Sequence, residues 1–221
     1  MVSSKPIWEK FLEIVERNPK STAIIESKTG EMVEFYELER QATRWKKLFE
    51  ILNINFVVFL GQPKIEQAGV PLACAASAKC FIPLNSKASQ NELKDILDNI
   101  GQKSLVFMED DFDFNSIELD SFEMDGTVIY LYNPSIKKRL ASKIPFLITY
   151  TSGSTGDPKG IYMHQNTKLK RTEQSINLFK VSKNDVILSA SPIFHSLGQR
   201  HYFLAMITGA TLVLSFPFVH D

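Results

Sequence analysis

Apolar residues along the chain follow two alternating patterns, a helical spacing and short continuous runs typical of buried strands. Ile7, Phe11 and Ile14 share one helix face, and the Asn18-Pro19 pair ends that helix. The same spacing predicts helices over residues 38–52, 67–78 and 89–100, with a weaker pattern over 166–179. Continuous runs predict strands over residues 22–25, 56–60, 80–83, 104–108, 127–131, 145–150, 185–189 and 210–214.

The alternation of helices and buried strands predicts an α/β fold, with layered, mainly parallel sheets flanked by helices. Residues 109–126 are acidic and weakly periodic, which indicates a surface loop. The expected organisation is a first α/β lobe over residues 1–108, this loop, and a second lobe that starts at residue 127 and runs to 221. The second lobe carries a polar, glycine-rich segment at residues 150–160.

Composition narrows the class of partner. The 25 Lys and Arg residues balance the 25 Asp and Glu residues without long runs of one sign, so nothing favours nucleic acid or an anionic membrane, and a small-molecule partner is expected. Cys74 and Cys80 lie in apolar sequence and are interpreted as reduced core residues. Lys5, Glu9 and Lys10 interrupt any signal-peptide core, which favours a cytoplasmic location.

Residues 202–220 contain no Asp, Glu, Lys or Arg and are almost long enough to cross a bilayer. Thr208-Gly209 divides the stretch, a β-branched run follows, and Pro217 comes near its end. Helix, turn and buried strand is therefore preferred over a membrane span.

The segment with the clearest chemistry runs from Tyr150 to Gly160, directly after a predicted strand. Its glycines let backbone N–H groups approach an anion, its hydroxyl groups add donors, and Lys159 adds a positive charge. The residues expected to bind phosphate are Thr151, Ser152, Gly153, Ser154, Thr155, Gly156 and Lys159. The order Pro158-Lys159-Gly160 does not match a Walker loop, and a Ser/Gly linker would not follow a buried strand with such an exit.

This segment resembles the signature loop of the adenylate-forming superfamily, which includes acyl-CoA synthetases, luciferases and adenylation domains of peptide synthetases. The resemblance extends in order through Phe35-Tyr36-Glu37-Leu38, Phe81-Ile82-Pro83-Leu84-Asn85 and residues 185–198, and so covers nearly the whole chain. Departures from the family pattern are Ala78 in place of glycine, Asn85 in place of aspartate, and Met163 before His164. The first two are interpreted as structural, and the third as a change near the nucleotide.

The resemblance implies ATP-dependent activation of a small-molecule carboxylic acid, with Mg²⁺, to an acyl adenylate. Transfer to the thiol of CoA, or to the phosphopantetheine of a carrier protein, would follow. Lys159 would be catalytic, stabilising the phosphates as pyrophosphate leaves. His195 matches a position that lines the acyl pocket, where amino-acid-activating relatives usually carry an aspartate. Because histidine supplies no fixed negative charge, acids without an α-ammonium group are favoured, although a buried core histidine is the alternative interpretation of His195.

In the family, the adenine and ribose contacts, a magnesium-binding glutamate and the C-terminal lid with its catalytic lysine follow the region that this chain matches. The 221-residue chain is therefore expected to give only background pyrophosphate exchange by itself. Three interpretations remain: part of a longer ligase, half of a split enzyme, or a catalytically incompetent binding or regulatory module. No metal site is expected, because the six-residue separation of His195 and His201 does not fit zinc binding.

Overall fold

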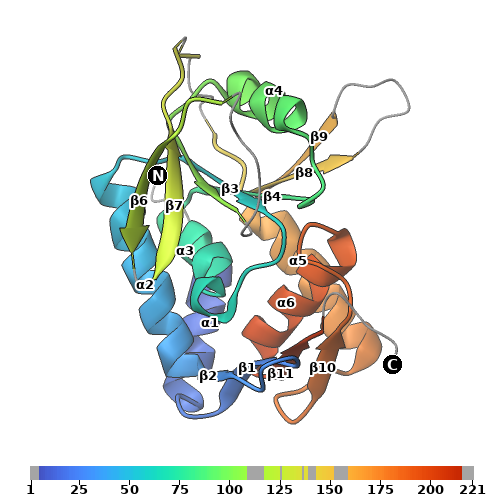
Figure 1. Cartoon of the computed structure of the whole chain (residues 1–221). Helices are drawn as coiled ribbons and strands as arrows, with labels where there is room; N and C mark the ends of the chain where they lie inside the picture. The colour runs from blue at the N-terminus through green and yellow to red at the C-terminus, as the bar shows by residue number, and fades with distance from the viewer. Residues whose placement is uncertain are drawn as a thin grey trace.

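The computed structural model describes residues 5–108, 117–124, 126–135, 137–138, 143–151 and 159–215. In this part of the chain, strands form a seven-stranded and a four-stranded sheet, with helices packed between and around them (Figure 1). The helices are α1 (Pro6–Arg17), α2 (Phe35–Ile51), α3 (Val70–Ser77), α4 (Gln90–Ile100), α5 (Gln165–Phe179) and α6 (Ser196–Thr208), with a short 3₁₀ helix, η1 (Ile65–Gln67). The strands are β1 (Thr22–Glu26), β2 (Met32–Glu34), β3 (Phe56–Leu60), β4 (Cys80–Leu84), β5 (Ser104–Phe107), β6 (Asp120–Met124), β7 (Thr127–Tyr132), β8 (Leu147–Thr151), β9 (Lys159–Met163), β10 (Val186–Ser189) and β11 (Thr211–Leu214).

The larger sheet has the order β6-β7-β5-β3-β4-β8-β9, in which the four central strands are parallel and the edge strands antiparallel. Both faces of its central strand, β3, are covered. Val57 and Phe59 pack with α2 and α3, whereas Phe56, Val58 and Leu60 pack with α4 on the opposite face (Figure 1). A strand buried on both faces needs a continuous apolar run, which is what residues 56–60 show. The predicted α/β fold, with a parallel centre flanked by helices, is confirmed.

The smaller sheet has the order β10-β11-β1-β2 and joins strands from near both ends of the described chain. β1 pairs parallel with β11, with Ile24 opposite Leu212, and helices α2 and α6 contact this sheet. Both sheets therefore contain strands from either side of residues 109–126. The division into lobes at 1–108 and 127–221 stays a prediction about domains, but the sheets themselves are shared between the two segments.

Two predicted elements differ from the structure. The helix expected over residues 67–78 is divided into η1 and α3, because the chain passes very close to α2 at Gly69. A Cβ atom on Gly69 would lie 2.7 Å from the backbone nitrogen of Ala42. The side chain of Gln41 accepts a hydrogen bond from Gly69 N–H and donates one to the Ile65 carbonyl, which fixes the turn between η1 and α3.

The predicted surface loop over 109–126 is wrong for residues 120–124, which form strand β6. β6 pairs antiparallel with β7 along its length, and Phe122 and Met124 pack against the core while the acidic side chains are exposed. The strand lies at a sheet edge, where charged residues are common, so its composition resembled that of a loop. Residues 109–116 and 125 of the predicted loop lie outside the described residues.

Other sequence predictions agree with the structure. Cys74 and Cys80 are buried free thiols, and burial raises the pKa of both, so neither is a reactive thiolate at neutral pH. Ala78 caps α3 in a left-handed conformation, with φ of 55°, which explains why a glycine suits this position. The apolar stretch forms α6, a turn at Gly209 and β11 as far as Leu214, and none of the described helices is long and apolar enough to span a bilayer.

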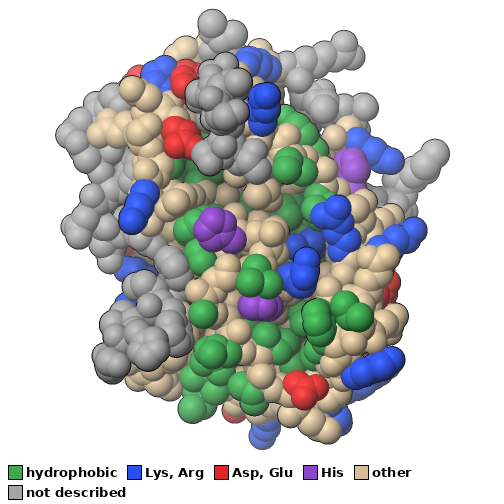
Figure 2. Space-filling view, turned by 90° about the vertical axis from the view of Figure 1, so that its right-hand side faces the viewer, with side chains coloured by type: hydrophobic (Ala, Val, Ile, Leu, Met, Phe, Trp, Pro, Cys, Tyr) green, Lys and Arg blue, Asp and Glu red, His purple; other side chains and the backbone are tan. Residues whose placement is uncertain are grey.

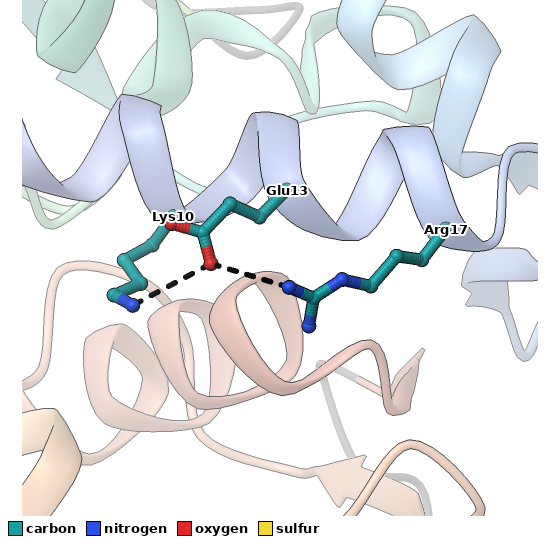
Figure 3. Close-up of polar contacts among 3 residues, drawn as sticks. All are labelled: Lys10, Glu13 and Arg17. Atoms are coloured by element: carbon teal, nitrogen blue, oxygen red, sulfur yellow. Dashed lines mark hydrogen bonds and ion pairs between the residues drawn. The ribbon is translucent and has the colours of Figure 1, made fainter.

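The opening helix, α1, shows how charge is placed on the surface. Ile7 and Phe11 are buried in the core, whereas Glu13 lies on the exposed side between Lys10, at 3.5 Å, and Arg17, at 4.0 Å (Figure 3). Exposed pairs of this kind contribute less than about 1 kcal/mol each. We interpret them as a solvated helix face rather than as a binding site.

Candidate functional site

A cleft of about 870 Å³ opens at the carboxyl ends of the parallel strands β4 and β8. Its walls come from β8, β9, the segment after β4, helix α5 and the start of helix α6. Ligands in open α/β sheets bind at the carboxyl ends of parallel strands, where successive loops meet. The topology therefore places the cleft where a ligand site is expected.

The candidate phosphate loop connects two strands that border this cleft. β8 and β9 pair antiparallel, with Tyr150 opposite Gly160 and Thr151 opposite Lys159, so the loop segment is preceded by a strand, as predicted, and followed by a second strand of the same sheet. Lys159 is exposed and lies two residues before Ile161, which lines the cleft, so both belong to the same face of β9. The predicted phosphate ligands Ser152, Gly153, Ser154, Thr155 and Gly156 lie outside the described residues, as does the side chain of Thr151.

His195 stands at the N-cap of α6 and lines the cleft. Its side chain is exposed, with its ring centroid 4.7 Å from that of Phe194, so the interpretation as a buried core histidine does not hold. Its backbone N–H donates to the Pro192 carbonyl at 3.0 Å, which holds the turn leading into α6. His195 therefore has the position that a residue contacting a ligand in the cleft needs.

Two departures from the family pattern also border the cleft, Asn85 and Met163. Asn85 follows β4, and its side-chain oxygen accepts a hydrogen bond from the backbone of Lys87 at 3.0 Å, which shapes the turn there. Asn85 thus has a structural role as expected, and it also faces the site. Met163 ends β9 and lies on the cleft wall, so an effect on ligand contacts stays a prediction.

Sequence reasoning missed Lys168 and Gln199, which meet at the buried end of the cleft. Lys168 is only 6 % exposed and Gln199 only 2 % exposed. Lys168 Nζ donates to Gln199 Oε1 at 3.4 Å and lies 5.0 Å from the ring centroid of Phe203. Gln199 Nε2 donates in turn to Thr149 Oγ1 at 3.3 Å. One polar chain thus connects α5, α6 and β8 at the cleft floor.

The sequence of α5 contains a pattern that could have identified Lys168. Its buried positions follow a helical spacing, but their side chains are polar. They are Gln165, Lys168, Thr172 and Ser175. An apolar stripe marks a helix face packed in a core; a polar stripe with the same spacing marks a face turned toward a polar cavity. Gln199 similarly lies one helical turn after His195 and could have been found from that spacing.

Cations dominate the ionisable groups that line the cleft. Lys87, Lys168, Arg171 and Arg200 contribute positive charge, and Glu92 contributes the one carboxylate among the described lining residues. Figure 2 shows lysine or arginine side chains beside a histidine near the middle of the face on which α5 and α6 lie. Within the described residues, no group of three or more His, Cys, Asp or Glu is placed to hold a metal ion. The cleft is thus suited to an anionic ligand.

Burial, and then the nearby positive charges of Arg171 and Arg200, lower the pKa of Lys168 to about 7. The unfolded chain, with a lysine pKa of about 10.4, therefore binds more protons than the folded chain between pH 7 and 10. Stability should rise with pH in this window, and the cost of burying the charge is fully present below pH 7.

We predict that Lys168→Met stabilises the protein at pH 6 by about 1 to 3 kcal/mol, because it removes a buried unpaired charge. The advantage should shrink as pH approaches 10. Urea unfolding at pH 6 and pH 9.5 measures this. Lys170→Met, an exposed neighbour on α5, is the control. An identical stability change at both pH values would show that Lys168 does not titrate in this range.

The sequence is similar to a known protein family and to several characterised proteins. The family described as AMP-binding enzyme matches residues 11–221. The indoleacetate–CoA ligase of Aromatoleum aromaticum is 29 % identical over 193 residues, covering 77 % of this chain and 37 % of the ligase. A D-alanine–D-alanyl carrier protein ligase of Bacillus anthracis is 24 % identical over 144 residues, covering 64 % of this chain and 29 % of that protein.

Among solved structures, the adenylation domain AlmE of Vibrio cholerae, in complex with glycyl-adenosine-5'-phosphate, superposes with a TM-score of 0.78. The sequences are 15 % identical, and the match covers 98 % of this chain and 46 % of that chain. At this identity the similarity establishes the fold. The chain therefore matches less than half of the length of each of these three proteins.

Proposed function

The chain belongs to the AMP-binding enzyme family, and from that premise we propose that it forms the acid- and phosphate-binding part of an AMP-forming carboxylate ligase. The observation that carries the proposal is the position of strands β8 and β9, which precede and follow the candidate phosphate loop in the sequence. The two strands that hold the candidate phosphate loop also form a wall of a cation-rich cleft at the carboxyl ends of parallel strands. Relatives that activate acids for CoA or for a carrier protein support the same class of reaction.

In the proposed reaction, a carboxylate oxygen of the acid attacks the α-phosphorus of ATP. A new P–O bond forms to the acid, the bond from the α-phosphorus to the β-phosphate oxygen breaks, and pyrophosphate leaves. Lys159, with the loop that begins at Thr151, would neutralise charge on the departing phosphates. ATP would enter as its Mg²⁺ complex, and no magnesium ligand is assigned to the described residues. A thiol of CoA or of a carrier protein's phosphopantetheine would then attack the acyl carbon and release AMP.

The charge of the cleft supports an acid without an α-ammonium group. By the family resemblance, His195 matches the position at which a carboxylate would pair with an ammonium, and Lys168 and Arg200 line the same cleft. A second cation placed among these groups would be repelled. Fatty, aryl and other simple carboxylic acids are thus preferred over amino acids.

The proposal is tested by trapping its product. The protein expressed from its complete reading frame is incubated with ATP, Mg²⁺, hydroxylamine and one acid at a time, and the hydroxamate formed from the acyl adenylate is identified by mass spectrometry. Amino acids serve as the comparison set. ATP-dependent formation of hydroxamates from simple acids would support the proposal. Formation of hydroxamates from amino acids alone would refute the substrate assignment.

We predict that His195→Ala reorders the preference among acids while leaving the KM for ATP nearly unchanged. The side chain lies on the cleft wall at the start of α6, where it would contact the acyl group and not the triphosphate. Altered contacts should change relative kcat/KM values by about 1 to 3 kcal/mol. Steady-state kinetics with one aryl and one aliphatic acid would measure this. Equal loss on both acids would move His195 out of the acyl pocket.

A further inference from the structure

The buried end of the cleft holds a cation without an anionic partner. Lys168 Nζ has Gln199 Oε1 as its hydrogen-bond acceptor and the face of Phe203 beside it. Within the described residues, the charges that act on Lys168 are those of Arg171 and Arg200, which are also positive. Glu92, the carboxylate on the cleft lining, is not among them. Lysine is rarely this buried unless it is paired, so the structure leaves the partner of Lys168 to be supplied by a ligand.

The amide of Gln199 fixes where Lys168 points. Its oxygen accepts from the lysine, and its nitrogen donates to Thr149, so the amide orientation is set from both sides. One of the three donors of the ammonium group is used by Gln199. The lysine lines the cleft, so its remaining donors are available to a group that enters from the cleft side.

Lys168 does not lie at the phosphate end of the site, which is the end of β8 at Thr151 where Lys159 is paired. Thr149 precedes the strand end at Thr151 by two residues, a separation of about 7 Å along β8. Lys159 lies at that strand end, opposite Thr151, whereas Lys168 is connected to β8 at Thr149, through Gln199. A carboxylate that reacts beside Lys159 would be a different group from the one that meets Lys168. The group that meets Lys168 must therefore lie at the far end of the acid.

We propose that the substrate acid carries a second carboxylate at its far end, and that this group binds Lys168, which Gln199 holds in place at the cleft floor. The inference rests on the proposed function, since it assumes that the reacting carboxylate lies toward Lys159. It assigns a substrate class, dicarboxylic acids, and it makes Lys168 the residue that selects that class. Lys168 touches no reacting atom and acts on specificity alone.

The first test compares matched acids that differ in the far carboxylate. Adipate is compared with hexanoate, and 4-carboxyphenylacetate with phenylacetate, in ATP-dependent activation by the protein expressed from its complete reading frame. The parent should favour at least one dicarboxylic acid by about 10-fold or more in kcat/KM. Lys168→Met should abolish that preference, because it should lower kcat/KM for the dicarboxylic acid by far more than for the matched monocarboxylic acid. Lys170→Met, on the exposed side of α5, should retain the parent preference.

Two kinetic outcomes would overturn the inference and leave the proposed function intact. One is a parent that activates monocarboxylic acids and shows no preference for either dicarboxylic acid. The other is a Lys168→Met variant that is slowed equally on both members of a pair, which would indicate a role in folding or in phosphate binding. Thermal melts of the variants separate a folding defect from a binding defect.

The second test does not depend on activity. The pKa of Lys168 is followed by NMR of the ¹³Cε-labelled lysine side chains, with the signal assigned by its absence from Lys168→Met. Adipate or 4-carboxyphenylacetate should raise this pKa, because an anion beside the amine favours its protonated form. Hexanoate and phenylacetate should not. A pKa raised by ATP or pyrophosphate but not by the dicarboxylic acids would assign Lys168 to phosphate and refute the inference, even in a protein that activates no acid tested.

Discussion

Replacing Lys159 with alanine is expected to lower kcat/KM by the same factor for every acid that the enzyme activates. Lys159 begins β9, opposite Thr151, and lies at the exit of the candidate phosphate loop. There it would meet the triphosphate, whose charge redistributes as pyrophosphate leaves. Loss of one such electrostatic contact costs about 2 to 4 kcal/mol of transition-state stabilisation, or roughly 30- to 900-fold in rate. Steady-state kinetics with ATP and several acids would measure it.

The control for this prediction is Lys28→Ala. Lys28 is an exposed lysine in the turn between β1 and β2, away from the cleft lining. Its replacement should leave the kinetics unchanged. A Lys159→Ala enzyme whose loss depends on the acid would place that lysine near the acyl group, and an enzyme with the parent rate would remove Lys159 from the mechanism.

Gly198→Ala is expected to destabilise the protein by about 3 kcal/mol or more, although alanine favours a helix over glycine by about 1 kcal/mol. Gly198 lies in the first turn of α6, where a Cβ atom would be 2.2 Å from the Pro192 carbonyl oxygen and 2.5 Å from that of Ser191. The Pro192 carbonyl is already held by the backbone N–H of His195. The clash is with backbone, so the start of α6 and His195 must move.

Gly30→Ala is the matched control for this substitution. Gly30 has φ of 74°, which strains an alanine, but no atom lies within 4 Å of the added Cβ. Its cost should be limited to about 1 to 2 kcal/mol of backbone strain. Chemical unfolding measures the free energy of unfolding of both variants, and so compares the cost of a steric clash with the cost of a strained backbone conformation. A Gly198→Ala protein that is as stable as the parent would show that the turn before α6 can shift freely.

Local sequence patterns predicted the fold well where one physical requirement dominates. The continuous apolar run of β3 follows from burial on both faces of a parallel sheet, and its predicted bounds are those observed. The helix predicted over residues 89–100 agrees with α4, which Ser89 caps: its Oγ accepts the Glu92 N–H at 3.1 Å. β6 was not predicted, since it is a short edge strand with exposed acidic residues and only two apolar side chains, Phe122 and Met124, that pack against the core.

Prediction of the site was limited for a related reason. The segment from Tyr150 to Gly160 and the residue His195 could be proposed as site residues because their chemistry lies in a short stretch of sequence. The pairing of Lys168 with Gln199 joins two helices that are 31 residues apart at the contact, and only the packing of α5 against α6 brings them together. The weak apolar pattern of α5 was informative, since its buried face is polar.

ATP–pyrophosphate exchange by the protein expressed from its complete reading frame tests directly whether it forms an acyl adenylate with the help of Lys159. The panel contains aliphatic, aryl and dicarboxylic acids together with amino acids, and each is measured with the parent and with Lys159→Ala. We expect exchange that requires an acid without an α-ammonium group and that falls by at least about 30-fold in the variant. Equal exchange in both proteins, or no acid-dependent exchange in the parent, would rule out the proposed reaction.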